Sequence, residues 1–316
     1  MLGSRTGEME LVTLRSGDAA VQLAPAAGGA VTRYWSERGG MTREWLRPTP
    51  AEALAAGNPY PAAAFPLIPY SNRIREGRFS FRGRSVVQPL NRPPERHCIH
   101  GHGWQAGWRP VDVRPAEARP EYPHAAGAWP WAYRATQRFT LNSSGLTVEL
   151  TLSNQSDAAM PAGLGWHPYF PRTARTTITA DVEAIWLTDD EMMPTALVSP
   201  PPTADLGRGV AVDAVALDNC FAGWRRRATI DWPERGARVV MTAEPPLDYL
   251  VVFTPPGRPF FCVEPVSHVT DAFNLAAAGR PDTGARTLEP GETLRAAITL
   301  TPECRPRSAT ARPAPR

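Results

Sequence analysis

Residues 133–152 read Tyr-Arg-Ala-Thr-Gln-Arg-Phe-Thr-Leu-Asn-Ser-Ser-Gly-Leu-Thr-Val-Glu-Leu-Thr-Leu. Polarity alternates along 133–141 and again along 146–152, as it does in a strand with one buried face. The Asn-Ser-Ser-Gly between the two runs supplies turn residues. This stretch therefore predicts an antiparallel hairpin, and it is the clearest such signal in the chain.

Short strand-like runs broken by Gly, Pro, Asn or Asp recur through most of the remaining sequence. Two further hairpins are predicted at 11–23 and 78–88, and one short helix at 49–56, ended by Gly57. Other predicted strands cover 30–35, 177–187, 228–232, 238–242, 249–254, 260–264 and 293–301. Many strands at close spacing indicate an all-β chain that forms a large antiparallel sandwich or barrel.

No internal repeat or Gly/Ser linker divides the chain, so we expect a single domain over residues 1–304. Residues 305–316 are rich in Arg, Pro, Ala and Ser, a composition typical of a disordered tail. The N-terminus lacks the apolar run of a signal peptide, and no window is long enough to span a bilayer. These features predict a soluble cytoplasmic protein without a membrane partner; the oligomeric state cannot be derived from them.

The composition excludes several classes of function. The net charge is only +3 and the basic residues are scattered, so we expect no nucleic-acid partner. The sequence contains no lysine, which excludes Schiff-base chemistry and a phosphate-binding P-loop. Its four cysteines lie far apart with no C-x-x-C pair, which argues against a disulfide scaffold and a structural zinc site.

Two stretches carry most of the candidate site residues, 65–78 and 96–104. In the first, Pro66 and Pro69 bar a regular helix and favour extended or turn geometry. An arginine on such a rigid segment, here Arg73, is well placed to bind hydroxyls or a carboxylate. The second stretch brings together three of the six histidines, His97, His100 and His102.

Three more candidates lie later in the chain. Pro168 directly follows His167 and restricts its backbone to an extended conformation. Glu264 ends the apolar run 260–263, where a carboxylate is costly unless it is hydrogen-bonded or functional. Asp218 sits where an apolar run meets a turn. A structural role is the more common one for a histidine in a β protein and for a turn aspartate, whereas for Glu264 structure and function are about equally common.

In a strand, His100 and His102 would place two imidazoles on one face, as in a metal site, because alternate residues of a strand share a face. The flanking glycines favour a turn instead, and no third ligand is specified. We therefore expect no metal and no cofactor. Gly163-Leu-Gly165 runs on into a proline and not into a helix, so it is not a dinucleotide-binding motif.

Five short motifs occur in the order found in one known family. They are Asn72-Arg-Ile74, Ile99-His-Gly101, His167-Pro-Tyr-Phe170, Asp218-Asn-Cys-Phe221 and Glu264-Pro265. The order and spacing of these motifs resemble those of the aldose 1-epimerases (galactose mutarotases). The resemblance runs from about residue 10 to about residue 302. The resemblance implies a large antiparallel β-sandwich of the galactose mutarotase type, in agreement with the strand pattern.

The resemblance also implies cofactor-free interconversion of the α and β anomers of a free aldose. By this likeness His167 would be the general acid that protonates the ring oxygen, and Glu264 the general base at the anomeric hydroxyl. Imidazole titrates near neutral pH, and a partly buried carboxylate can be shifted toward the same range. His100 would bond the sugar near its ring oxygen.

The remaining roles are for substrate binding. Arg73 would donate to the sugar hydroxyls, Asp218 would accept from them, and Asn72 belongs to the same set. Phe253 is the expected aromatic platform for the pyranose, with Trp104 as the alternative.

The run His100-Gly-His-Gly-Trp104 departs from the two glycines that often follow this histidine. The stretches Arg73-Ile-Arg-Glu-Gly-Arg78 and Glu264-Pro-Val-Ser-His268 resemble a less characterised bacterial branch of the family. The sugar preference therefore does not carry over. Two alternatives stay open: an epimerase of a phosphorylated hexose, with Arg75 and Arg78 as phosphate ligands, and a sugar-binding domain without catalysis. The joint presence of His167 and Glu264 favours an enzyme.

Overall fold

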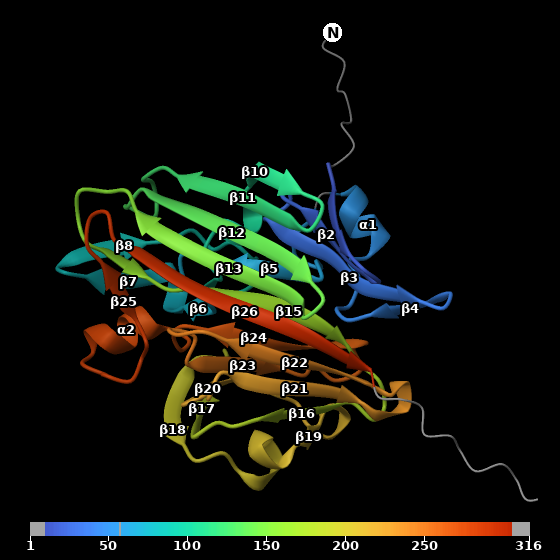
Figure 1. Cartoon of the computed structure of the whole chain (residues 1–316). Helices are drawn as coiled ribbons and strands as arrows, with labels where there is room; N and C mark the ends of the chain where they lie inside the picture. The colour runs from blue at the N-terminus through green and yellow to red at the C-terminus, as the bar shows by residue number, and fades with distance from the viewer. Residues whose placement is uncertain (1–9, 57, 305–316) are drawn as a thin grey trace, which may run out of the picture.

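Two large antiparallel sheets lie one in front of the other in the computed structural model of the protein (Figure 1). The structure describes residues 10–56 and 58–304. The predicted tail, 305–316, lies outside the described residues. The predicted all-β sandwich is confirmed.

The first sheet has eleven strands, in the order β1-β2-β3-β5-β15-β24-β23-β20-β17-β18, with β4 pairing β3. Its strands are β1 (Val12–Ser16), β2 (Ala19–Ala24), β3 (Ala30–Arg38), β4 (Met41–Glu44), β5 (Ala64–Leu67), β15 (Gly165–Pro171), β17 (Ala184–Thr188), β18 (Pro194–Val198), β20 (Asp218–Ala222), β23 (Tyr249–Phe253) and β24 (Phe260–Val266). In its centre β5, β15 and β24 are neighbours although they lie far apart in the sequence.

The second sheet has nine strands, in the order β10-β11-β12-β13-β26-β22-β21-β16-β19. They are β10 (Arg109–Arg114), β11 (Glu117–His124), β12 (Tyr133–Asn142), β13 (Gly145–Asn154), β16 (Thr177–Ala180), β19 (Val210–Ala211), β21 (Arg227–Trp232), β22 (Ala237–Ala243) and β26 (Thr293–Cys304). β12 and β13 pair throughout, from Tyr133↔Asn154 to Asn142↔Gly145. The predicted 133–152 hairpin is thus confirmed.

Smaller elements complete the fold. Three two-stranded sheets pair β6 (Arg73–Ile74) with β9 (Cys98–Ile99), β7 (Arg78–Phe81) with β8 (Arg84–Val87), and β14 (Met160–Ala162) with β25 (Arg286–Leu288). The β6–β9 pair joins the two stretches that carry most candidate site residues. The α-helices of the described residues are α1 (Ala51–Ala55), inside the predicted 49–56, and α2 (Ala272–Ala277).

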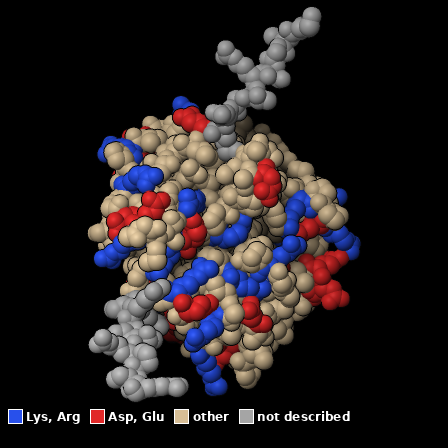
Figure 2. Space-filling model, turned by 90° about the vertical axis from the view of Figure 1, so that its right-hand side faces the viewer, with Lys and Arg blue, Asp and Glu red and all other residues tan. Residues whose placement is uncertain are grey.

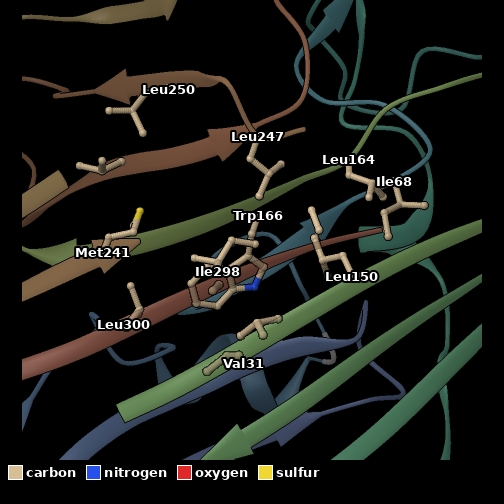
Figure 3. Close-up of a cluster of buried hydrophobic side chains, with 14 of the residues drawn as sticks. Val31, Ile68, Leu150, Leu164, Trp166, Met241, Leu247, Leu250, Ile298 and Leu300 are labelled. Atoms are coloured by element: carbon tan, nitrogen blue, oxygen red, sulfur yellow. The ribbon is translucent and has the colours of Figure 1, made fainter. Parts of the chain in front are cut away.

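The main core fills the space between the two sheets. Leu150 of β13, Ile298 of β26 and Trp166 of β15 are each 0% exposed and point into this space (Figure 3). Because side chains alternate along a strand, every second residue of the central strands faces this core.

The opposite face of the eleven-stranded sheet holds a second apolar cluster. It includes Phe65, Tyr169, Val251 and Cys262 of the sheet, covered by Trp104 and other residues of the 58–105 segment. The central strands are therefore buried on both faces, in keeping with their nearly continuous apolar sequences. Polar side chains are exceptions on this second, mainly apolar face.

The structure corrects two predictions and adds elements that were not predicted. The predicted strand 177–187 is two strands, β16 and β17, which belong to different sheets, because the chain turns at Asp181–Glu183. Helix α2 and the hairpin of β10 and β11 were not predicted. Glu264 does not end its strand: β24 continues to Val266, since Pro265 still fits an extended backbone.

The surface carries both signs of charge, interspersed over the face in Figure 2. Among the described residues, no helix is long and apolar enough to cross a membrane.

We expect Leu150→Ala to lower the free energy of unfolding by about 2–5 kcal/mol, because it opens a cavity between the two sheets. Leu90→Ala, at a position that is 45% exposed, is the control and should change stability by no more than about 0.5 kcal/mol. Urea denaturation of both variants measures the difference. Equal effects would contradict this placement of the core.

Candidate active site

A polar cavity lies on the outer face of the eleven-stranded sheet. Its lining comprises Tyr60, Asn72, Arg73, Arg92, Ile99, His100, His167, Tyr169, Asp218, Val251, Phe253 and Glu264. The seven residues that the sequence nominated for the site, His167, Glu264, Arg73, His100, Asp218, Asn72 and Phe253, all belong to it. The fold brings them together from six separate segments of the chain.

Strand register places His167 and Glu264 side by side on the floor of this cavity. β15 and β24 are antiparallel, with the pairs Gly165↔Val266 and Tyr169↔Cys262. Continuing this register sets His167 opposite Glu264, and alternation points both side chains to the same face. His167 Nε2 lies 3.3 Å from Glu264 Oε1, and the residues are only 6% and 2% exposed.

Aromatic packing fixes the imidazole of His167. Its ring lies 4.6 Å from that of Phe65 on the paired strand β5 and stacks at 4.6 Å and 15° on Tyr169. On the far side, the Arg47 guanidinium lies 4.6 Å from the Tyr169 ring. The His167 ring is thus held so that its Nε2 edge faces Glu264.

Burial disfavours charge on both members of the pair. Desolvation lowers the pKa of His167 to about 3. Desolvation, with a smaller contribution from Asp218, raises the pKa of Glu264 well above its usual value, while Arg73 acts in the opposite direction. In the cavity without sugar the two groups therefore favour a net neutral state with one acidic proton between them.

His100 is held in one tautomer by the backbone. Its ring Nδ1 accepts a hydrogen bond from the backbone N–H of Asn72 at 3.1 Å, and the backbone N–H of His100 donates to the Asn72 carbonyl at 2.9 Å. Burial lowers the pKa of His100 well below 6.5, and the nearby His167 and Arg73 lower it further. The neutral ring thus carries its proton on Nε2, which makes that nitrogen a donor.

A close backbone crossing sets the position of His100. Gly101 has φ +65°, and a Cβ at this position would lie 2.2 Å from the Ile68 carbonyl oxygen. The same oxygen accepts hydrogen bonds from the N–H groups of His102 and Gly103. Only glycine allows this approach, so the Gly101 of the predicted motif has a steric basis.

The segment that follows Glu264 braces the wall of the cavity. His268 accepts the Ser71 N–H on Nε2 at 3.0 Å, and Asp271 accepts the Arg75 N–H at 3.0 Å. The Asp271 N–H in turn donates to the Arg73 carbonyl at 2.8 Å. These bonds hold the backbone around Asn72 and Arg73 in place.

Four charged side chains form a network at the side of the cavity. Arg73 lies 3.5 Å from Glu95 and 3.7 Å from Asp218, measured between nitrogen and oxygen. Arg92 bonds Glu95 at 2.6 Å and lies 4.1 Å from the Tyr60 ring centroid. Burial raises the pKa of Asp218, and Arg73 partly offsets this. Both guanidinium groups thus have carboxylate partners.

The structure separates the two candidate aromatic platforms. Phe253 lines the cavity and is paired with Asp218 across β23 and β20. Trp104 is 3% exposed and packs behind the lining, with ring centroids 5.6 Å from Phe65 and 5.9 Å from Tyr60. Of the two, only Phe253 can face a ligand in this cavity.

His102 and His97 lie away from the cavity lining. His102 stacks on His124 at 4.4 Å and 4°, and its Nδ1 is 2.8 Å from the Tyr133 hydroxyl. His97 accepts the Glu76 N–H and lies 3.4 Å from Glu191. The turn at Gly101 sends His100 and His102 to different surroundings, so they do not form the strand-face pair considered for a metal.

Sequence analysis missed five lining residues: Tyr60, Arg92, Ile99, Tyr169 and Val251. Ile99 and Tyr169 lie within the quoted motifs and could have been inferred from strand alternation. Tyr60 and Arg92 come from loops, where no local pattern indicates which side chain turns inward.

The chain is similar to known proteins over nearly its whole length. The family model described as aldose 1-epimerase matches residues 10–301. The uncharacterised Escherichia coli K12 protein YphB is 30% identical over 92% of this chain and 98% of its own. A crystal structure of an E. coli K12 protein superposes with a TM-score of 0.84 at 30% identity, covering 93% of this chain and 99% of its own.

A galactose mutarotase-like protein from Clostridium acetobutylicum has the same fold, with a TM-score of 0.83 at 21% identity, over 96% of this chain and 97% of its own. From the family match, the chain belongs to the aldose 1-epimerase family. The likeness suggested by the five sequence motifs is thereby confirmed.

We expect Gly101→Ala to destabilise the protein more than Gly83→Ala. Both glycines have positive φ, +65° and +80°, but a Cβ on Gly83 meets nothing within 4 Å. The control therefore carries only the backbone strain, about 1–2 kcal/mol, whereas Gly101→Ala adds the clash with Ile68. Thermal and urea unfolding of both variants measure the difference, and equal losses would argue against the close crossing.

Proposed function

We propose that this protein interconverts the α and β anomers of an unphosphorylated aldose by proton transfer, without a cofactor. The observation that carries the proposal is the buried contact between His167 and Glu264, 3.3 Å long, on the floor of a polar cavity. Ring opening requires one group that takes the proton of the anomeric hydroxyl and one that protonates the ring oxygen. Both oxygens are bonded to C1, so an adjacent base and acid suit the reaction.

In the proposed reaction Glu264 takes the proton of the anomeric hydroxyl while His167 gives a proton to the ring oxygen. The bond between C1 and the ring oxygen breaks, and the open chain ends in an aldehyde. Rotation about C1–C2 presents the other face of the carbonyl. Ring closure returns one proton from Glu264 to O1 and the other from the ring oxygen to His167.

The electrostatics of the pair suit this exchange. Burial favours net neutrality and one shared proton, and the reaction changes only which group carries that proton. In the empty cavity the two pKa shifts place that proton on Glu264; ring opening starts from the form in which His167 carries it, and Glu264 carries it again afterwards. The net charge of the cavity is the same at both stages, so no unpaired charge has to be stabilised in a buried site.

The remaining lining groups match a polyhydroxylated ligand. His100 offers its Nε2–H, Arg73 and Asn72 add further donors, and Asp218 is an acceptor. Phe253 supplies an apolar face for the pyranose. Hydroxyl groups both donate and accept, so they can bond such a mixed set.

The arrangement of charges favours a neutral sugar over a sugar phosphate. Arg75, one proposed phosphate ligand, lies 3.9 Å from Asp189 and 3.8 Å from Asp271. Arg78 is exposed on β7, and neither arginine lines the cavity. Arg73 and Arg92, which do line it, face Glu95 and Asp218. A phosphate would have to compete with these carboxylates.

Polarimetry of freshly dissolved α-D-glucose and α-D-galactose tests the proposal. We expect the protein to accelerate relaxation, and Glu264→Gln and His167→Gln each to lower kcat by about 10²–10⁴-fold. Glu289→Gln, which changes an exposed carboxylate, is the control and should keep full activity. If no free aldose relaxes faster with the wild-type protein, the proposal fails and sugar phosphates and pure binding are the next candidates.

The pH dependence of kcat/KM should be bell-shaped, because the working pair holds one proton. Binding of a second proton inactivates the pair. Because the pKa of His167 is lowered to about 3, the acid limb of the profile should lie below pH 6.5, where an ordinary imidazole titrates. Loss of the shared proton inactivates the pair at high pH. Because the pKa of Glu264 is raised, this basic limb should lie above pH 4.5, where an ordinary glutamate titrates. Rates at constant ionic strength, corrected for buffer catalysis, measure both limbs; an acid limb at or above pH 6.5 would contradict a buried neutral imidazole.

A further inference from the structure

We propose that His167, Glu264 and Cys262 form an inhibitory site for a thiophilic divalent cation such as Zn²⁺ on the floor of the cavity. The binding site follows from geometry alone, whereas its effect on catalysis rests on the proposed function. Neither Cys262 nor a cation was part of the reaction described above.

The three side chains share one face of two adjacent strands. Tyr169↔Cys262 and Gly165↔Val266 set the register of β15 against β24, so Glu264 lies opposite His167, and Cys262 is two residues before it. One donor atom of each of the three residues lies within 4.8 Å of the other two. All three side chains are buried, and Cys262 is 0% exposed.

The separations suit a small tetrahedral ion. Zn–N and Zn–S bonds of about 2.0–2.3 Å place neighbouring ligand atoms about 3.3–3.8 Å apart. The 3.3 Å between His167 Nε2 and Glu264 Oε1 already falls in this range. The Cys262 sulfur lies within 4.8 Å of both other donor atoms, so binding would draw the three side chains closer together.

The donor set favours zinc or cadmium over magnesium or calcium. A thiolate, an imidazole nitrogen and a carboxylate oxygen are ligands of zinc sites, whereas magnesium and calcium prefer oxygen alone. One thiolate and one carboxylate also neutralise a divalent ion, which suits a site where burial makes net charge costly. Arg73 opposes a cation nearby, but Asp218 and Glu95 offset its charge.

Metal binding and proton transfer are mutually exclusive at this site. The ion takes the His167 lone pair and a Glu264 oxygen, which are the atoms that the proposed reaction uses to carry protons. His167 and Glu264 line the cavity, so water or a sugar hydroxyl there could supply a fourth ligand. Zn²⁺ is therefore an inhibitor here and not a cofactor.

Cobalt spectroscopy tests the binding site without reference to activity. Metal-free protein, kept reduced with a phosphine, is titrated with Co²⁺, which gives a thiolate-to-cobalt charge-transfer band in the near ultraviolet. We expect one equivalent to develop this band and Zn²⁺ to abolish it. Cys262→Ser and Cys262→Ala should lack the band, and Cys304→Ser, which removes the exposed thiol, should keep it. A wild-type protein without the band, or one whose band depends on Cys304, would overturn the site.

Inhibition is measured separately. Zn²⁺ should slow mutarotation by the wild-type protein, and EDTA should restore it. For Cys262→Ser the Zn²⁺ concentration that halves the rate, relative to that variant's own metal-free rate, should rise by about tenfold or more. An unchanged value would overturn the inhibitory role. A cobalt band in a protein without mutarotase activity would leave the metal site standing and refute only the proposed function.

Discussion

The register of β15 against β24 is the constraint on which the site depends. It sets His167 opposite Glu264 on one face of the sheet, while Trp166 on the other face enters the core between the sheets. A shift of one residue would exchange these faces, sending the imidazole into the core and the indole into the cavity. The packing of Trp166 and its neighbours thus fixes the geometry of the polar pair (Figure 3).

The floor and the wall of the cavity are joined through one short segment of chain. β24 carries Glu264, and His268 and Asp271, a few residues later, hold the backbone of Ser71 and Arg75. His100 is attached to the same wall by its two hydrogen bonds with Asn72. A movement of Glu264 relative to the wall would break buried hydrogen bonds, each costing about 1–3 kcal/mol if left unmade. The groups proposed to contact a sugar are therefore preorganised.

The cost of burying charge accounts for the electrostatic character of the site. Arg73 and Arg92 have carboxylate partners, and His167 and Glu264 favour a neutral state with one shared proton. A neutral sugar can enter without bringing a charge that the site cannot balance. A divalent cation can also be accommodated, because a thiolate and a carboxylate cancel its charge. Net neutrality thus underlies both the proposed reaction and the proposed inhibition.

The local pattern of the sequence was sufficient to predict those elements whose structure depends on residues close together in the chain. The 133–152 hairpin follows from alternation and a four-residue turn, and the motif residues were recognised by their order. The 177–187 run shows the limit of this reasoning, since its composition is strand-like throughout while the chain changes sheets within it. The choice between Phe253 and Trp104, and the contribution of Tyr60 and Arg92, depend on where loops lie over the sheet, which no short-range pattern records.

The sequence by itself determined the all-β class, the family resemblance and the seven nominated residues that line the cavity. Only the tertiary structure decided which strands are neighbours, and with that the contact of His167 with Glu264 and the proximity of Cys262 to both. The physical reason is that alternation along a strand is a local steric property. Pairing between distant strands depends instead on the burial of whole faces, which involves the entire chain.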